Sequence, residues 1–148
     1  GTGQFVSVAQ TTDEIWNAAM DVNLTGTFLC VRESLSLFEK TGGGLIINNA
    51  SIAAVRGFSS FAAYCASKAG VLGLSRALRE ELREKKIRVA VILTGATDTP
   101  FWDHVAGDWN RSLMIRPEEV AQSVTLIASM PREALIEDIT LMPAAGAL

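Results

Sequence analysis

Histidine and cysteine are scarce in this 148-residue sequence, which has one histidine and two cysteines. The cysteines, Cys30 and Cys65, lack the close spacing of metal ligands, so no metal site is predicted from them. Both lie in apolar helical patterns, and we therefore expect two buried free thiols. Unpaired thiols favour a reducing, cytoplasmic setting. His104 lies in an irregular stretch, where a lone histidine more often has no chemical role.

Basic blocks and long apolar runs are also missing. The net charge is −3 and the isoelectric point is about 5.1. A nucleic-acid partner is not expected, because binding to phosphates needs a basic surface. No apolar run approaches the roughly 20 residues of a membrane span, and the start has no signal-peptide layout. The sequence thus predicts neither a nucleic-acid nor a membrane partner.

Apolar residues, in contrast, are abundant. They make up 49% of the chain, and the mean hydropathy is +0.26. This composition suits a parallel sheet that helices cover on both faces. It also suits a piece of a larger body, or a subunit with a large interface. The length is that of one ordinary domain.

Helical and extended patterns alternate along the chain. They predict helix, strand, helix, strand, helix and strand, in that order, over residues 12–40, 45–50, 60–84, 89–93, 117–130 and 139–142. Such alternation indicates an α/β fold of parallel βαβ units with right-handed crossovers. Thr11 and Glu14 have the spacing of a capping box at the start of the first helix, and the glycines at 42–44 end it.

Tyr64 and Lys68 are four residues apart, so they lie one turn apart on one face of the predicted helix 60–84. A free tyrosine has a pKa of about 10. A neighbouring ammonium favours the phenolate and lowers this pKa, which suits a general acid or base near neutral pH. The pair alone is common by chance, and the alternative is a surface tyrosine that stacks on a lysine stem.

Ser51 comes just after the predicted strand 45–50 and 13 residues before Tyr64. Ligands of open α/β sheets bind at the carboxyl ends of the strands. A hydroxyl at that place can hydrogen-bond a substrate carbonyl or alkoxide. The alternative is a serine that caps a turn.

A set of motifs in a fixed order surrounds these residues. The motifs are MDVNLTGT at 20–27, INNAS at 47–51, AYCASKAG at 63–70, GATDTP at 95–100, RPEEVA at 116–121 and ITLMP at 139–143. In content and spacing they resemble the short-chain dehydrogenase/reductase family over nearly the whole chain. The resemblance implies the C-terminal half of a Rossmann-like, doubly wound parallel sheet, with about three strands and three main helices. Residues 1–148 would then form a single incomplete catalytic domain.

The resemblance also implies the roles of the catalytic residues. Tyr64 would donate or accept the proton, and Lys68 would lower the tyrosine pKa and hold the nicotinamide ribose. Ser51 would orient the substrate oxygen. Asn23 would hold a water that links Lys68 to solvent. A compatible alternative is that Asn23 is buried and ties up backbone groups at a helix kink.

The implied reaction is hydride transfer between NAD(P)(H) and a small carbonyl or alcohol substrate. The backbone around Gly95 and Thr97, together with the Thr99 hydroxyl, would hold the nicotinamide carboxamide. Phe101, Trp102 and Trp109 lie in the segment that covers the substrate in the family. These aromatic side chains favour an apolar pocket there, with simple packing as the alternative.

Two departures from the family pattern stand out. Thr94 replaces the usual proline before Gly95, which should loosen that turn slightly. The family's first strand and glycine-rich phosphate-binding turn have no counterpart here, since the glycines at 42–44 follow a helix. The residue that separates NAD from NADP belongs to that region, so either cofactor fits the sequence.

A sheet of about three strands should expose an edge and an apolar face. We therefore expect a homo-oligomer through helices 12–40 and 60–85, although these helices could simply cover the sheet. The first functional hypothesis is an oxidoreductase, or the catalytic half of one. The second is a truncated, non-enzymatic remnant that oligomerisation stabilises. A third is an epimerase or dehydratase of the wider family.

Overall fold

The computed structural model describes residues 1–105 and 107–146, and the side chain of His104, with its predicted lack of a role, lies outside the described part. The described residues form a three-stranded parallel sheet from β1 (Gly44–Asn49), β2 (Ile87–Thr94) and β3 (Asp138–Leu141), in the order β1-β2-β3. The longer helices are α1 (Asp13–Met20), α2 (Gly26–Thr41), α3 (Ala62–Glu81) and α4 (Pro117–Ser129). The predicted α/β class is confirmed.

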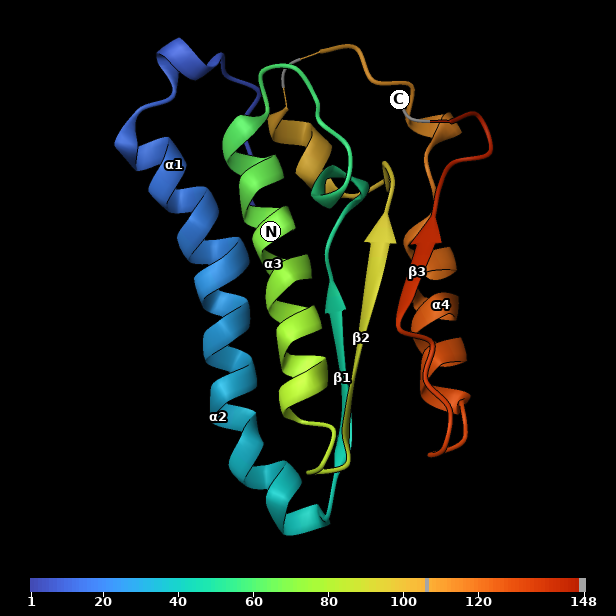
Figure 1. Cartoon of the computed structure of the whole chain (residues 1–148). Coiled ribbons are helices and arrows are strands. Elements are labelled where there is room, and N and C mark those ends of the chain that lie inside the picture. Colours follow the sequence, from blue (N-terminus) through green and yellow to red (C-terminus); the bar gives the residue numbers. More distant parts are fainter. Residues whose placement is uncertain (106, 147–148) are drawn as a thin grey trace.

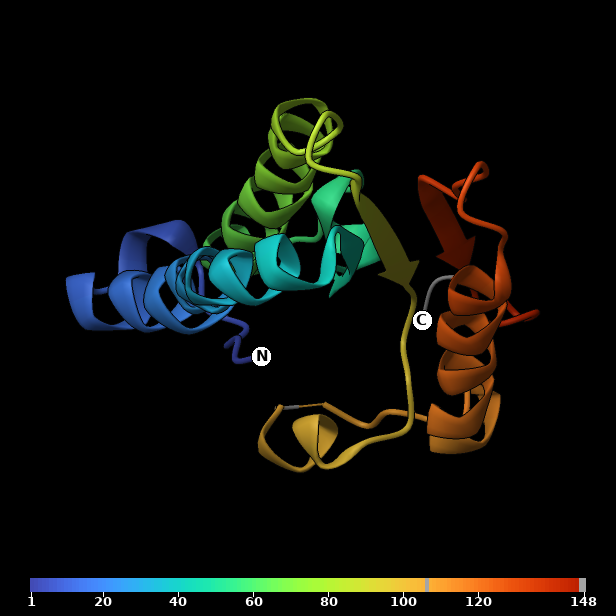
Figure 2. The same cartoon turned by 90° about the horizontal axis from the view of Figure 1, so that it is seen from below.

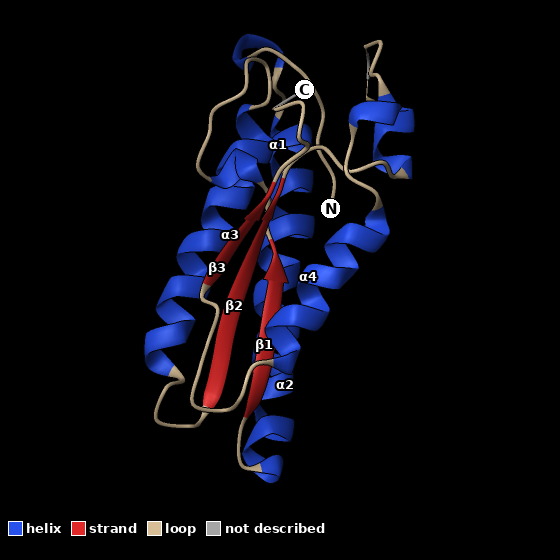
Figure 3. Ribbon diagram, turned by 90° about the vertical axis from the view of Figure 1, so that its right-hand side faces the viewer, coloured by secondary structure: helices blue, strands red, loops and turns tan. Residues whose placement is uncertain are grey.

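The two faces of the sheet carry different helices, as Figures 2 and 3 show. The side chains of successive β2 residues point to opposite faces of the sheet. Val89 packs in one cluster with side chains from α2 and α3. Its neighbour Ala90 packs with Ile127 of α4 on the opposite face. The α2 helix lies beside the β1 edge of the sheet (Figure 1).

The two crossovers differ in hand. Both β1-α3-β2 and β2-α4-β3 step across the sheet in the same direction (Figure 1), yet α3 and α4 lie on opposite faces. The first crossover is right-handed as predicted, and the prediction is wrong for β2-α4-β3, which is left-handed. The irregular segment 95–116 permits this exception, because it carries the chain around the carboxyl edge of the sheet before α4 begins.

The first predicted helix contains a π-helical turn at Asp21–Thr25, which joins α1 to α2. Its N-cap is one residue later than predicted: Thr12 accepts a hydrogen bond from the Ile15 backbone, whereas the Thr11 hydroxyl donates to Ser7. The helix ends as expected at Gly42, where a φ of 72° favours glycine.

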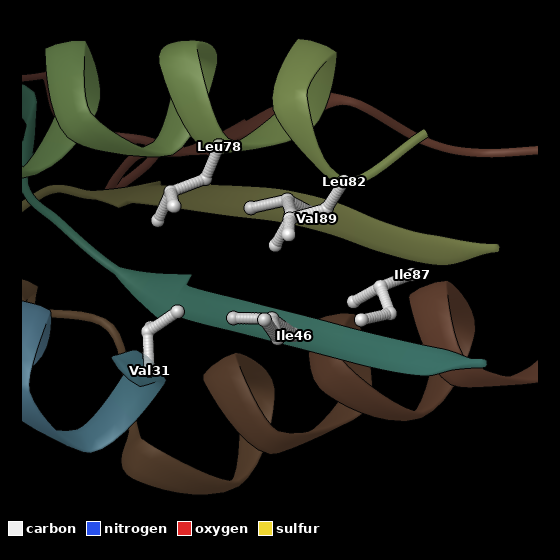
Figure 4. Close-up of a cluster of buried hydrophobic side chains, with 6 residues drawn as sticks. All are labelled: Val31, Ile46, Leu78, Leu82, Ile87 and Val89. Carbon is white, nitrogen blue, oxygen red and sulfur yellow. The ribbon is translucent and has the colours of Figure 1, made fainter. Parts of the chain in front are cut away.

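The largest cluster of buried apolar side chains among the described residues lies between the sheet and helices α2 and α3 (Figure 4). Its members are buried aliphatic side chains from α2, α3, β1 and β2, namely Val31, Ile46, Leu78, Leu82, Ile87 and Val89. Burial of one such side chain contributes about 1.5–3 kcal/mol relative to exposure. This contact fixes α3 on the sheet, and α3 carries Tyr64 and Lys68.

Arg79 is a buried arginine that ties α3 to the start of β3. Its Nε donates to the Val89 carbonyl at 2.9 Å. Its terminal nitrogens donate to the Glu137 carbonyl at 2.8 Å and to the Asp138 carboxylate at 2.7 Å. The side chain of Arg76 reaches the same carboxylate from solvent. One side chain therefore links a helix, the central strand and an edge strand.

Cys30 is exposed on α2 and Cys65 is partly buried, so the expectation of two buried thiols is wrong. The first helices also expose several large apolar side chains, namely Trp16, Val22, Phe28, Leu29 and Leu37. Apolar periodicity does not separate a core face from a face left open. No helix among the described residues is long and apolar enough to cross a membrane.

Candidate active site

The three strands end at one edge of the sheet, at the top of Figure 1. The loops that follow β1 and β2 lie beside the start of α3 there and line a cavity of about 470 Å³. This volume is within the range of small-molecule sites. Six of the seven predicted site residues line the cavity: Ser51, Tyr64, Lys68, Gly95, Thr97 and Thr99. Asn23 is not among the lining residues.

Ser51 is positioned by the end of β1 and by a short 3-10 turn at Ile52–Ala54. Its hydroxyl accepts a hydrogen bond from the Ala53 backbone at 3.1 Å and lies 3.4 Å from the Thr94 carbonyl. Tyr64 lines the same cavity as Ser51. Ser51 therefore caps the turn, as the alternative interpretation has it, and it also lines the cavity.

Tyr64 and Lys68 lie on one face of α3. The Lys68 ammonium is 5.7 Å from the centroid of the Tyr64 ring and donates to the Asn49 carbonyl at 3.1 Å. Burial raises the pKa of Tyr64 above its usual value, although the hydrogen bond with Ser51 acts in the opposite direction. Burial lowers the pKa of Lys68.

This balance differs from the expected lowering of the tyrosine pKa by the lysine. Desolvation of the Tyr64 phenolate is the largest cause, and it outweighs the stabilising hydrogen bond from the site. The Lys68 ammonium is itself desolvated and is directed at a backbone carbonyl. In this structure the phenol therefore holds its proton at neutral pH.

Asn23 lies in the π-helical turn and is buried. Its side-chain nitrogen donates to the Thr2 carbonyl at 2.8 Å and to the Ser67 hydroxyl at 2.9 Å, and its oxygen accepts from the Thr2 backbone. These contacts match the alternative in which a buried asparagine ties up backbone groups at a helix kink. They also bring Asn23 near the site, because Gly1 lies between Asn23 and Lys68.

Gly95 begins the loop after β2 and lies tightly against the end of β3. Its backbone nitrogen donates to the Leu141 carbonyl at 2.8 Å. A Cβ atom at Gly95 would lie 2.7 Å from Cδ of Pro143, so only glycine fits without a shift. The Thr97 hydroxyl donates back to the Gly95 carbonyl at 3.1 Å. These contacts hold the predicted nicotinamide-binding loop on the cavity wall.

Arg111 was not predicted from the sequence, and it organises the segment that covers the cavity. Its guanidinium pairs with the carboxylates of Asp98 and Asp103 and donates to the Thr99 carbonyl at 2.9 Å. These hydrogen bonds raise the pKa of Arg111. Opposite charges in one irregular segment were the signal that could have identified it. The predicted aromatic side chains at 101, 102 and 109 do line the cavity.

The residues present fit the nicotinamide end of a dinucleotide. The cavity wall offers an ammonium and several hydroxyl donors, which suit a ribose and a carboxamide. A glycine-rich turn between a strand and a following helix, which would bind the pyrophosphate, does not occur in residues 1–105 and 107–146. The described chain therefore provides groups for the nicotinamide half of such a cofactor.

Comparison with known proteins agrees with the fold and motifs. The family model for short chain dehydrogenases matches residues 1–109. A sepiapterin reductase of Chlorobaculum tepidum is 33% identical over 99% of this chain, which corresponds to 59% of that protein. The chain thus spans less than two thirds of the length of this relative.

Solved structures show the same fold. An alcohol dehydrogenase from the archaeon Thermococcus sibiricus, complexed with 5-hydroxy-NADP, is 23% identical and superposes with a TM-score of 0.88, over 100% of this chain and 62% of that chain. A metagenomic short-chain oxidoreductase in complex with NADP is 28% identical with a TM-score of 0.78, over 97% of this chain and 58% of that chain. The resemblance predicted from the motifs is confirmed, and the chain belongs to the short-chain dehydrogenase family.

Proposed function

We propose that this chain forms the nicotinamide and substrate half of an oxidoreductase site. In this site a hydride moves between NAD(P)(H) and a carbonyl or alcohol carbon. The observation that supports the proposal is the convergence of Tyr64, Lys68 and Ser51 on one cavity at the carboxyl edge of the sheet. Membership of the family agrees with it.

The cofactor supplies the hydride when it is bound. Lys68 would hold its ribose, and the backbone around Gly95 and Thr97 would hold its carboxamide together with the Thr99 hydroxyl. Both NAD and NADP remain in the proposal, because the lining residues suit the nicotinamide end that the two share. Similar solved structures contain NADH or NADP.

In the direction of reduction, Ser51 orients the substrate oxygen and Tyr64 gives it a proton. Burial raises the pKa of Tyr64, so the phenol carries its proton before the transfer but is a weaker acid than a free tyrosine, and the transfer depends on stabilisation of the phenolate. The Lys68 ammonium then stabilises the phenolate that remains. Asn23 has an indirect role, because its hydrogen bonds with the Thr2 backbone anchor the residues beside Lys68.

The test is the Tyr64→Phe variant of this chain, assayed for ketone-dependent oxidation of NADH and NADPH. Loss of the general acid should lower kcat by about 10²–10⁴-fold. Lys68→Met should also lower kcat, while Lys85→Met, which removes an exposed lysine paired with Glu39, should not. A kcat of the Tyr64→Phe variant within threefold of the parent value would overturn the proposed role of Tyr64. Turnover without net NAD(P)H consumption would favour an epimerase or dehydratase.

A second candidate is a non-enzymatic module that self-association stabilises. The exposed apolar side chains of α1 and α2, such as Trp16 and Phe28, favour an interface that includes these two helices. Calorimetric titration separates the candidates, because heat at micromolar NADH or NADPH supports the enzyme and silence supports the module. Sedimentation at several protein concentrations tests the proposed homo-oligomer. A cytoplasmic setting, suggested by the free thiols, also remains a proposal.

A further inference from the structure

Six aromatic side chains form a closed circuit on the wall of the cavity, which we call the aromatic enclosure. Each ring contacts the next, and the centroids lie 3.9–5.9 Å apart. In order around the circuit they are Phe5, Phe61, Tyr64, Phe101, Trp102 and Trp109. All six line the cavity. The proposed proton donor is therefore part of the enclosure.

The enclosure has two kinds of wall. Phe5, Phe61 and Tyr64 form a stack, with interplanar angles of 10° and 18°. Phe101 and Trp102 meet edge to face at 84°, and Trp102 meets Trp109 at 53°. A wall with both ring edges and ring faces can receive another flat ring in either of the arrangements that aromatic pairs prefer.

Simple packing does not account for the whole enclosure. Phe61 is buried, as expected for a core residue, but Phe101, Trp102 and Trp109 keep part of their surface accessible. These rings come from the irregular segment 95–116, which Arg111 holds over the cavity. The accessible apolar surface is thus presented at a fixed place beside the reacting phenol.

The distribution of charge on the cavity wall also bears on the kind of substrate that it can bind. Lys68 provides the only charged side chain among the described lining residues. The nearby guanidinium of Arg111 is already paired with two carboxylates and does not line the cavity. Because the proposed function assigns Lys68 to the cofactor ribose, a phosphate or carboxylate on the substrate would lose water without gaining a side-chain cation of its own, which is costly.

Resting on the proposed function, we propose that the substrate is an uncharged carbonyl or alcohol whose reacting carbon is joined to a flat aromatic or conjugated ring system. The ring system lies within the aromatic enclosure and places the carbonyl oxygen between Tyr64 and Ser51. One aromatic contact changes affinity by roughly two- to tenfold, and the enclosure offers more than one.

The test compares three methyl ketones that differ in one property each. The first carries a naphthyl group, the second a straight alkyl chain of the same carbon number, and the third a naphthyl group with a carboxylate on its far ring. We expect kcat/KM for the naphthyl ketone to exceed each of the others by at least about tenfold. An equal or higher value for the alkyl or the carboxylated ketone would overturn the inference.

Two variants test whether the aromatic enclosure causes the preference for the naphthyl ketone over the alkyl ketone. Trp109→Leu and Phe101→Leu should lower the naphthyl-to-alkyl ratio of kcat/KM by about threefold or more. Trp16→Leu is the matched control, because Trp16 lies on α1 outside the cavity, and it should leave the ratio unchanged. An unchanged ratio in both cavity variants would contradict the inference.

A binding measurement separates this inference from the proposed function. The alcohol corresponding to the naphthyl ketone is titrated calorimetrically into the parent chain and the Trp109→Leu variant. Binding that Trp109→Leu weakens, without turnover of any ketone, would overturn the proposed function and uphold the enclosure as a ring-binding site. Turnover of ketones with no preference for the naphthyl group would overturn the inference and uphold the function.

Discussion

Replacing Arg79 by methionine tests the link between α3, β2 and β3. Methionine keeps most of the apolar stem but removes the donors to the carbonyls of Val89 and Glu137. Val89 is fully buried, so its carbonyl loses a partner that water cannot replace. An orphaned buried acceptor costs about 1–3 kcal/mol, and the part-buried Glu137 carbonyl costs less. The carboxylates of Glu137 and Asp138 remain partly hydrated in the variant. We therefore expect the free energy of unfolding to fall by about 2–4 kcal/mol in total.

Urea unfolding followed by circular dichroism measures this loss as a lower midpoint at an unchanged slope. Arg76→Met is the control, because Arg76 is 58% exposed and pairs with the same carboxylate of Asp138. An exposed pair contributes about 0–1 kcal/mol. The reasoning fails if Arg79→Met costs less than about 1 kcal/mol, or if the two variants lose the same stability.

Three further predictions concern the site and the sheet. Tyr64 is the only tyrosine, so ultraviolet titration of the native chain should show phenolate only above the pH at which the urea-unfolded chain titrates; equal midpoints would contradict burial as the cause of its raised pKa. Gly95→Ala should lower the free energy of unfolding by about 1–3 kcal/mol, because the new Cβ meets Pro143. Gly57→Ala is the control and should cause no such loss, since the space around Gly57 is open. Similar urea midpoints for the two variants would refute the close approach of Gly95 to Pro143. Desolvation alone would raise the pKa of Asp138, but the hydrogen bonds and charges of Arg79 and Arg76 together lower it in the folded chain. The contribution of Asp138 to stability is therefore present above the unfolded carboxyl pKa of about 3.9 and is lost as the pH falls through the lower folded value; an acid-unfolding profile that Asp138→Asn leaves unchanged would refute this.

The sequence predicted the elements and most of the site because their signals are local. Periodicity located the helices and strands to within a few residues, and the carboxyl ends of two strands placed Ser51 and Gly95 at one edge. The motif order then indicated Tyr64 and Lys68. The predictions of helices and strands depend on spacing within one segment, which the chain itself fixes, whereas Tyr64 and Lys68 were indicated by the resemblance of several motifs along the chain.

What the sequence did not predict depends on contacts between distant segments. Cys30 shares the apolar pattern of its helix, but no other described segment covers that face. The sign of the Tyr64 pKa shift depends on how deeply the folded chain buries this side chain. The partner rings of Phe5 are 56 and 104 residues away along the chain, at Phe61 and Trp109. The left-handed crossover likewise depends on the path of a long loop, which periodicity does not report.

The π-helical turn at Asp21–Thr25 sets which side chains of the first helix face inward. Ala19 and Val31 are both buried, although 12 positions on a regular helix would place them about 120° apart around the axis. The turn absorbs one residue and reduces this angle to about 20°. It also turns Asn23 inward and leaves Val22 outside. Making the turn regularly α-helical with every residue kept would rotate α1 by about 100° against α2, whereas deleting one residue within the turn would keep the faces of α1 and α2 and remove only the extra residue that the turn absorbs.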